Sequence, residues 1–166
     1  QRIDIVGNTI TDEAVIRSEL LLDEGDPFNN LKLDQSMSRL KARNIFGEVE
    51  NKVVDGSTKG EKIIEISVEE KPTGEISAGA GVGTNGGSFS ANITENNWLG
   101  KGISVGTSLD VSKETFQGTL TYSNPNHNFS GNSLNYFVSS TSNKKSTSGY
   151  NNKIYSTGIG TKFEQY

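Results

Sequence analysis

The chain has 166 residues, of which 31% are hydrophobic and 22% are charged, with a net charge of −4 and no cysteine. The absence of cysteine excludes disulfide bridges and thiolate metal sites. Scattered lysines and arginines form no aromatic–basic stripe, which argues against a nucleic-acid-binding surface. No stretch reaches the ~20 apolar residues of a spanning helix, and no signal peptide is visible. Because the chain starts in a strand-like run, we expect a fragment that lacks its leader and further strands.

Residues 1–71 predict a small α+β domain with the order strand, helix, helix, strand, strand. A short strand at 2–6 precedes a helix that has Thr11 as its N-cap and ends by Gly25. A second helix is expected over 31–44, with its leucines and methionine buried and Arg39, Lys41 and Arg43 outside. Strands at 48–54 and 62–70 follow. The economical packing is two helices on one face of a three-stranded sheet, and Pro72 ends the domain.

Residues 73–163 predict six antiparallel strands joined up-and-down. Apolar residues recur at every second position, while Ser, Thr, Asn, Gln and Gly occupy the positions between them, which is the period of a β-strand. The apolar face is expected to hold Ile76, Ala78, Ala80, Val82, Phe89, Ala91, Ile93, Ile103, Val105, Leu109, Val111, Phe116, Leu120, Tyr122, Leu134, Tyr136, Val138, Tyr155, Ile159 and Phe163.

Two environments fit this alternation. Segments of about 9–11 residues that are apolar outside and polar inside are typical of a transmembrane β-barrel. An ordinary antiparallel sheet with one solvated face shows the same period. The largely uncharged polar face favours the barrel, but the pattern leaves both environments open.

Several patterns that imitate ligand sites are set aside. Gly81, Gly83 and Gly86 match G-x-G-x-x-G, but the following residues alternate as a strand, whereas a dinucleotide site needs a helix there. The only histidine, His127, has no second imidazole or thiolate to complete a metal site. The acidic groups Asp23, Glu24, Asp26 and Glu65, Glu69, Glu70 are interpreted as solvated surfaces. We predict no catalysis, no cofactor and no metal.

Longer stretches carry a family resemblance. The βααββ order, with "GN" after the first strand, "RLKARNIFGEVE" before the second and "VEEKPTGEISAGAGVGTNGGSFSANITENNWLGKG" at the join, resembles BamA-type outer-membrane assembly factors. The chain is similar to the membrane-proximal POTRA domain of that family followed by the first barrel strands. The most specific part is residues 81–84 together with a turn motif, and Asn124-Pro125 also fits. The turn motif consists of Asn97, Trp98, Leu99, Gly100 and Gly102.

The resemblance implies a location for each part. Residues 1–71 would be a POTRA domain in the periplasm, and 72–166 would be about six N-terminal strands of an outer-membrane β-barrel. Turns at 96–101 and 124–132 would lie at the periplasmic rim, with the aromatic residues Trp98, Tyr122 and Phe129 near it. Loops at 84–87 and 142–152 would lie outside. The implied partners are nascent outer-membrane β-barrel proteins, accessory periplasmic lipoproteins and outer-membrane lipid.

In this family the barrel opens between its first and last strands, so the first strand here would be the template edge for an incoming strand. Glycine weakens a strand, which suits a seam that opens, but glycines that only relieve crowding in a curved wall remain the alternative. The template strand consists of Gly74, Glu75, Ile76, Ser77, Ala78, Gly79, Ala80, Gly81, Val82 and Gly83.

A second edge is expected in the POTRA domain if its C-terminal strand is central, as the family fold implies. This edge consists of Val49, Glu50, Asn51, Lys52 and Val53. Its charged residues discourage aggregation while leaving backbone groups free. It either receives nascent chains or a partner subunit, or is a plain protected edge.

Two other functions remain open. A POTRA-barrel transporter of the two-partner secretion or autotransporter-assembly type would have the same architecture. A soluble adhesin or ligand-binding β-domain would have a different one. With open edges and an apolar face, the chain alone is expected to self-associate in water.

Overall fold

The computed structural model describes residues 1–57, 60–84, 86–128, 131–145 and 148–163. The chain forms two compact units. The first unit contains Gln1–Pro72 together with Leu99–Gly102, and the second contains Thr73–Trp98 and Ile103–Tyr166. The sequence predicts a first domain over 1–71, and the first unit extends to Pro72 and also includes Leu99–Gly102, which the sequence did not predict.

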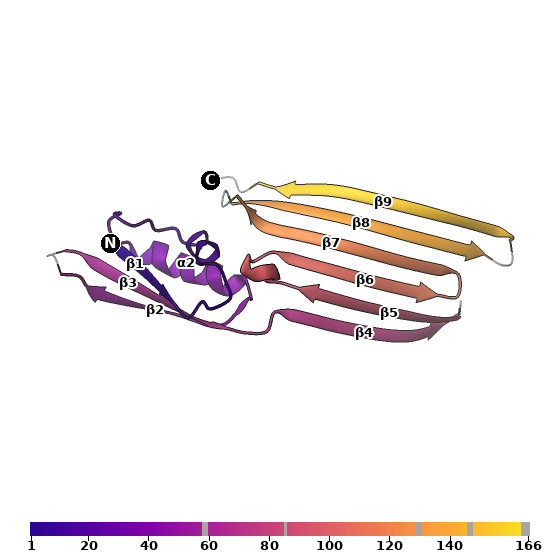
Figure 1. Ribbon diagram of the computed structural model, residues 1–166, viewed down its shortest axis with the longest axis horizontal. Helices are drawn as coiled ribbons and strands as arrows, with labels where there is room; N and C mark the ends of the chain where they lie inside the picture. Colours follow the sequence, from indigo (N-terminus) through magenta and orange to yellow (C-terminus); the bar gives the residue numbers. More distant parts are fainter. Residues whose placement is uncertain (58–59, 85, 129–130, 146–147, 164–166) are drawn as a thin grey trace. The chain divides into compact units, whose positions relative to one another are not determined.

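The first unit contains β1 (Arg2–Val6), α1 (Glu13–Arg17), α2 (Asn30–Ala42), β2 (Phe46–Asp55) and β3 (Lys62–Glu70) (Figure 1). Its sheet has the order β1-β3-β2, in which β1 is parallel to β3 and β2 is antiparallel to it. The C-terminal strand is therefore central, and the predicted βααββ order is confirmed.

The core of the first unit lies between the sheet and the helices. Ile64, Ile66 and Val68 alternate along β3 and are all nearly inaccessible to water, as the period of two requires. Leu33 and Leu40 on α2 belong to the same buried cluster. Helix α2 begins where the side chain of Asn29 accepts a hydrogen bond from the Lys32 amide at 3.2 Å.

The first helix is much shorter than the sequence predicts. It ends at Arg17 because the next amides turn more tightly: Glu19 N donates to Ile16 O and Leu20 N to Arg17 O. Its N-cap is Asp12, whose side chain makes no capping bond, whereas Thr11 is buried. The predicted capping role of Thr11 is therefore wrong.

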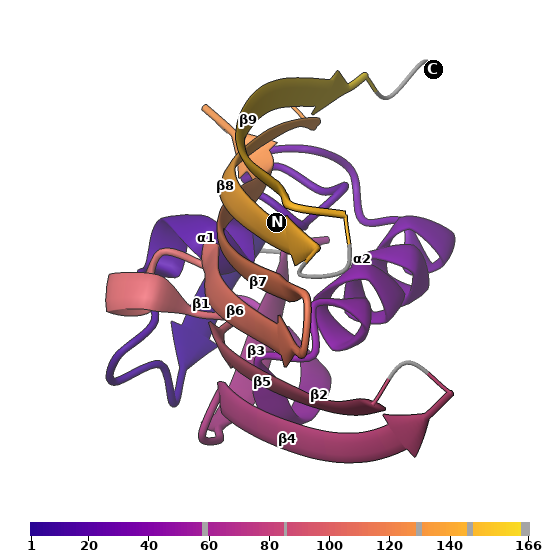
Figure 2. The ribbon, with the colours of Figure 1, turned by 90° about the vertical axis from the view of Figure 1, so that its right-hand side faces the viewer.

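The second unit is one antiparallel sheet of six strands in sequence order, which Figure 2 shows as a single curved layer. This confirms the up-and-down prediction. Its strands are β4 (Gly74–Gly83), β5 (Gly86–Glu95), β6 (Ser104–Ser112), β7 (Thr115–His127), β8 (Asn132–Lys145) and β9 (Tyr150–Lys162).

The register places the predicted apolar residues on one face. Ile76 pairs with Ile93 and Ala80 with Phe89, Val111 pairs with Phe116, and Tyr136 pairs with Ile159. Directly paired residues share a face, so Ser77 and Asn92 lie together on the other one. Phe137 and Ile154, which pair with Gly158 and Thr141, are apolar exceptions on that polar face.

Three predicted loops are shorter than expected, because strand pairing extends into them. Gly86 already pairs with Gly83, and β8 and β9 pair as far as Lys145 and Tyr150. His127 is the last residue of β7 and pairs with Asn132, rather than lying in a free turn. Asn85, within the predicted loop 84–87, and the predicted rim residue Phe129 fall outside the described part of the chain.

Among the described residues, the structure contains no helix long and apolar enough to cross a membrane.

Candidate functional site: the edge strand β4

Strand β4 forms one edge of the six-stranded sheet. In the described part of the chain it pairs only with β5, in an unbroken register from Gly74↔Glu95 to Gly83↔Gly86. All ten of its residues are exposed. One row of its backbone N–H and C=O groups therefore faces away from the sheet, which is the arrangement that accepts a further strand.

Crowding does not require glycine at Gly79, Gly81 or Gly83 of β4, whereas a methyl group at Gly74 would lie 3.3 Å from Glu95 Oε2, a tight contact. A methyl group at Gly79 would lie 3.6 Å from Ser90 Oγ, one at Gly81 would lie 3.5 Å from Ser88 Oγ, and one at Gly83 would contact nothing within 4 Å. These are ordinary contact distances.

Glycines farther along the sheet contrast with those of β4. A methyl group at Gly158 would lie 2.2 Å from Cε1 of Phe137, whose ring covers this position from the neighbouring strand. One at Gly106 would lie 2.8 Å from Thr121 Oγ1. Crowding therefore demands glycine at Gly106 and at Gly158, which lies on the opposite edge strand β9, and it does not demand glycine at Gly79, Gly81 or Gly83 of β4.

The start of β4 is tied to the end of β5. The carboxylate of Glu95 accepts hydrogen bonds from Thr73 Oγ1 and from the Asn97 amide at 2.8 Å. The Asn96 amide donates to Thr73 O at 3.2 Å. These bonds fix β4 at its base. Sequence reasoning missed them, because a lone Glu and Thr 22 positions apart carry no recognisable spacing.

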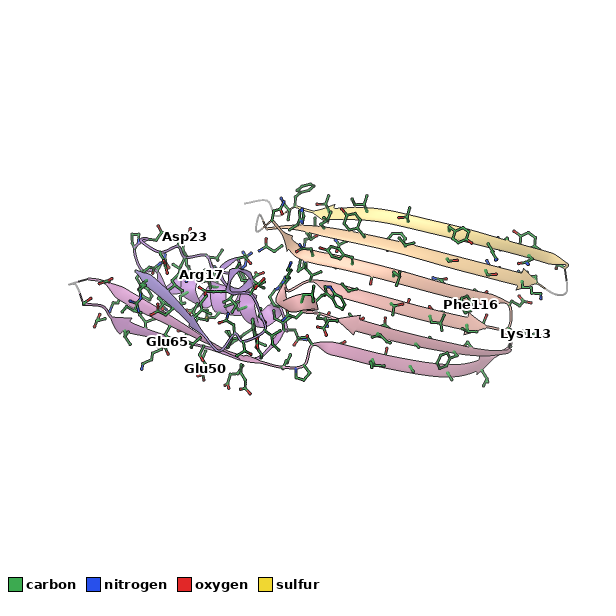
Figure 3. All side chains as sticks on the ribbon, viewed as in Figure 1. Arg17, Asp23, Glu50, Glu65, Lys113 and Phe116 are labelled. Carbon is green, nitrogen blue, oxygen red and sulfur yellow. The ribbon has the colours of Figure 1, made fainter. Side chains whose placement is uncertain are left out.

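The second predicted edge is also an edge in the structure. Strand β2 pairs only with β3 among the described residues of the first unit. Val49 is buried and Val53 packs against the core, whereas Glu50, Asn51 and Lys52 are exposed. Figure 3 labels Glu50 on this strand. The salt bridge between Lys62 and Asp55 at 2.5 Å joins β3 to the end of β2.

The turn motif lies in an unusual backbone conformation. Trp98 N donates to Ile103 O at 2.9 Å, which closes the base of the turn. Between these residues, Leu99, Gly100 and Gly102 have φ angles of 54°, 72° and 62°. This left-handed region is uncommon for a bulky residue such as leucine. The predicted turn is thus present in the structure.

In each of the two acidic groups predicted to be solvated surfaces, most members are exposed, but one carboxylate has structural partners. Glu70 accepts hydrogen bonds from the amides of Thr9, Ile10 and Thr11 at 3.1, 2.9 and 2.6 Å, and from Thr9 Oγ1 at 2.5 Å. Burial alone would raise the pKa of Glu70, but these bonds to the ionised form outweigh it and lower the pKa to about 2.

Glu24, from the second acidic group, accepts a hydrogen bond from Ile3 N at 3.2 Å and lies 3.4 Å from Arg17 Nη1. Glu70 and Glu24 therefore help to hold the first unit together. In the described ranges, no three acidic or histidine side chains converge as metal ligands.

Comparison with known proteins identifies the family. The POTRA model, described as a surface antigen variable number repeat, matches residues 1–71. Outer membrane protein assembly factor BamA of Neisseria meningitidis serogroup B is 32% identical over 138 residues, which cover 82% of this chain and 17% of that protein. BamA of Neorickettsia risticii is 37% identical over 103 residues, which cover 60% of this chain and 14% of that protein. The chain belongs to the BamA-type family.

A solved structure agrees with this assignment. BamA from Haemophilus ducreyi lacking POTRA domains 1–3 matches the BamA-type chain with a TM-score of 0.84 and 27% identity, over 93% of this chain and 30% of that one. CdiB from Acinetobacter baumannii has a TM-score of 0.63 at 14% identity, over 97% of this chain and 33% of that one, which shows the fold alone. The BamA-type chain thus spans less than a fifth of the two curated relatives described above.

Proposed function

We propose that this BamA-type chain acts within an outer membrane protein assembly factor, where it supplies a periplasmic receiving domain and the first strands of the barrel. Its role is to help fold and insert outer-membrane β-barrel proteins, without catalysing a reaction. The proposal draws on the name shared by its relatives, outer membrane protein assembly factor. A secretion role is less well supported, because the likeness to CdiB is one of fold only.

The observation that carries the proposal is the exposed edge of β4. When a strand enters the hydrocarbon of the membrane, each backbone N–H or C=O that stays unpaired costs several kcal/mol of free energy. Pairing with the free backbone row of β4 removes that cost as the strand arrives. The hydrogen bonds to Glu95 fix the start of β4. The part of the strand from Gly79 onward is not crowded, and it is therefore able to bend and open.

The first unit offers a second edge for the same clients. We assign β2 the role of first receiving the extended client, through the row of backbone groups beside Glu50, Asn51 and Lys52. The surface of the same unit would also meet accessory periplasmic lipoproteins. Outer-membrane lipid would cover the apolar face of the second unit, where Ile76 and Val82 are among the most exposed apolar side chains.

The template role is tested with paired cysteine variants of a full-length assembly factor that carries this chain. Ala78 on β4 and Ala91 on β5 are the same residue type, pair directly and share a face. A client strand paired with β4 would lie about 4.8 Å from β4 and about 10 Å from β5. A disulfide needs Cα atoms within about 7 Å of each other.

A client with a cysteine in its last strand is therefore expected to form a disulfide with the Ala78→Cys variant and not with Ala91→Cys. The readout is the mixed disulfide on a non-reducing gel during insertion. Equal yields at the two positions, or none at Ala78, would refute the template role.

A further inference from the structure

The segment Leu99–Gly102, here called the anchor segment, belongs to the first unit although both of its flanks belong to the second. The chain therefore passes between the two units at three peptide bonds: 72–73, 98–99 and 102–103. The first crossing is a linker. The other two crossings are the ends of the four-residue anchor segment. The contacts of this segment inside the first unit indicate its role.

Backbone contacts hold the middle of the anchor segment. Asp12 N donates to Gly100 O at 2.8 Å. A methyl group at Gly100 would lie 2.1 Å from Ile10 O, so only glycine allows this approach. The same loop, residues 8–12, also donates hydrogen bonds to the Glu70 carboxylate at the end of β3. The loop therefore contacts both β3 and the anchor segment.

A buried side-chain network holds the end of the anchor segment. Arg43 Nη2 donates to Gly102 O at 2.7 Å. The side chain of Arg43 is 12% exposed, and its Nε lies 3.6 Å from Oε1 of Glu19, whose side chain is 9% exposed. Arg39 approaches the other oxygen of Glu19 at 3.4 Å. Arg43 was predicted to point outward. It points into the domain instead, where its Nη2 donates to the Gly102 carbonyl and its Nε is paired with the Glu19 carboxylate by charge, without a hydrogen bond among the described residues.

We infer that the anchor segment is an integral part of the POTRA fold, and that Arg43 is a positioning residue that ties the connection between β5 and β6 to this domain. Without the segment, the Asp12 amide and the buried Arg43 guanidinium would each lose an acceptor. This inference does not depend on the template role of β4.

Hydrogen exchange read by mass spectrometry tests the tie in a full-length assembly factor that carries this chain, in detergent. In Arg43→Gln, peptides covering the Asp12 amide and the anchor segment are expected to exchange about five- to tenfold faster. Arg43→Lys keeps a cationic donor and is expected to restore slow exchange. The control Arg39→Gln removes the other arginine that approaches Glu19, and is expected to leave the anchor segment protected.

A second pair of variants distinguishes the loss of the Gly100 contact from the strain of a side chain at positive φ. Gly100 and Gly25 both have positive φ, but a methyl group at Gly25 would meet nothing within 4 Å. Gly100→Ala is expected to release the Asp12 amide, and Gly25→Ala is not. The Thr9 and Ile10 amides, which donate to Glu70, serve as internal controls. Unchanged exchange in Arg43→Gln, or equal acceleration of these control amides, would overturn the inference.

Discussion

The carboxylate of Glu70 holds the loop that leads into α1. It stands at the end of β3 and accepts three backbone amides of residues 9–11. The loop includes buried Thr11, and its next amide, that of Asp12, binds Gly100 O. One side chain thus joins the central strand to the loop on which the anchor segment rests.

The first prediction concerns the pH dependence of this contact. The pKa of Glu70 in the folded chain is about 2, below its ordinary value of 4.5. Its stabilising contribution is therefore present above about pH 5 and is lost progressively as the pH falls toward about 2. Glu70→Gln is expected to lower the free energy of unfolding at neutral pH by about 1–2 kcal/mol, since it replaces charge-assisted hydrogen bonds of a partly exposed group.

The measurement is thermal unfolding of the detergent-bound chain, followed by the helical circular dichroism of the first unit at about pH 7, 5 and 3. Glu69→Gln, at an exposed neighbouring position, is the control. The same acid destabilisation in Glu70→Gln and in the unchanged chain would contradict the assignment.

At the scale of the element, β4 and β9 are both sheet edges, but β4 is built differently. Four of its ten residues are glycine, and the three of these from Gly79 onward have room for a methyl group. Glycine weakens a strand by about 0.5–1 kcal/mol relative to alanine. Since packing does not demand these glycines, their effect is a weaker and more flexible edge.

The second prediction follows from this difference. The double variant Gly79→Ala/Gly81→Ala is expected to keep the fold and to stabilise β4 by about 0.5–1 kcal/mol per residue, while it slows client insertion because the edge becomes stiffer. Gly158→Ala is expected to destabilise the sheet, because the Phe137 ring occupies the space for the new methyl group.

Unfolding in detergent and insertion of a client into liposomes, both with the full-length protein, separate these effects. Loss of stability in the double variant would show that the glycines serve wall packing. Unchanged insertion in a stable double variant would show that the flexibility of β4 has no role in the seam.

At the scale of the whole molecule, the two units bury apolar residues differently. The first unit has a closed core that includes Leu33, Leu40 and Ile64. The second is a single sheet whose apolar face includes exposed Ile76, Leu120 and Ile159. A single layer has no opposite layer against which to bury that face. The second unit therefore needs another cover, whether lipid, detergent or another copy.

The third prediction is that the 166-residue chain self-associates in water and disperses in detergent. Copies are expected to associate through the edges β4 and β9 or through the apolar face. Light scattering with and without detergent measures the mass. A Val82→Lys variant places a charge on the exposed β4 edge and is expected to weaken edge pairing. A monomer in plain water with this face exposed would contradict the prediction.

Local patterns were sufficient for most of the architecture. The period of two predicted a strand that ends at Gly83, as β4 does, and assigned most apolar residues to their face, with Phe137 and Ile154 as exceptions, because side-chain alternation depends only on neighbouring positions. The βααββ order followed in the same way, and the family followed from motifs. Loop lengths were overestimated, since polar residues such as Lys144 also continue a paired strand.

Only the tertiary structure decided which residues meet across long separations. The sequence by itself placed Gly100 and Gly102 in a turn, Arg43 on the second helix and Glu70 at the end of a strand. It did not determine that Arg43 reaches Gly102, 59 positions away, or that Glu70 reaches Thr11 over the same separation. Hydrogen bonds of this kind leave no local periodicity, because their geometry arises only after the core of the first unit has packed.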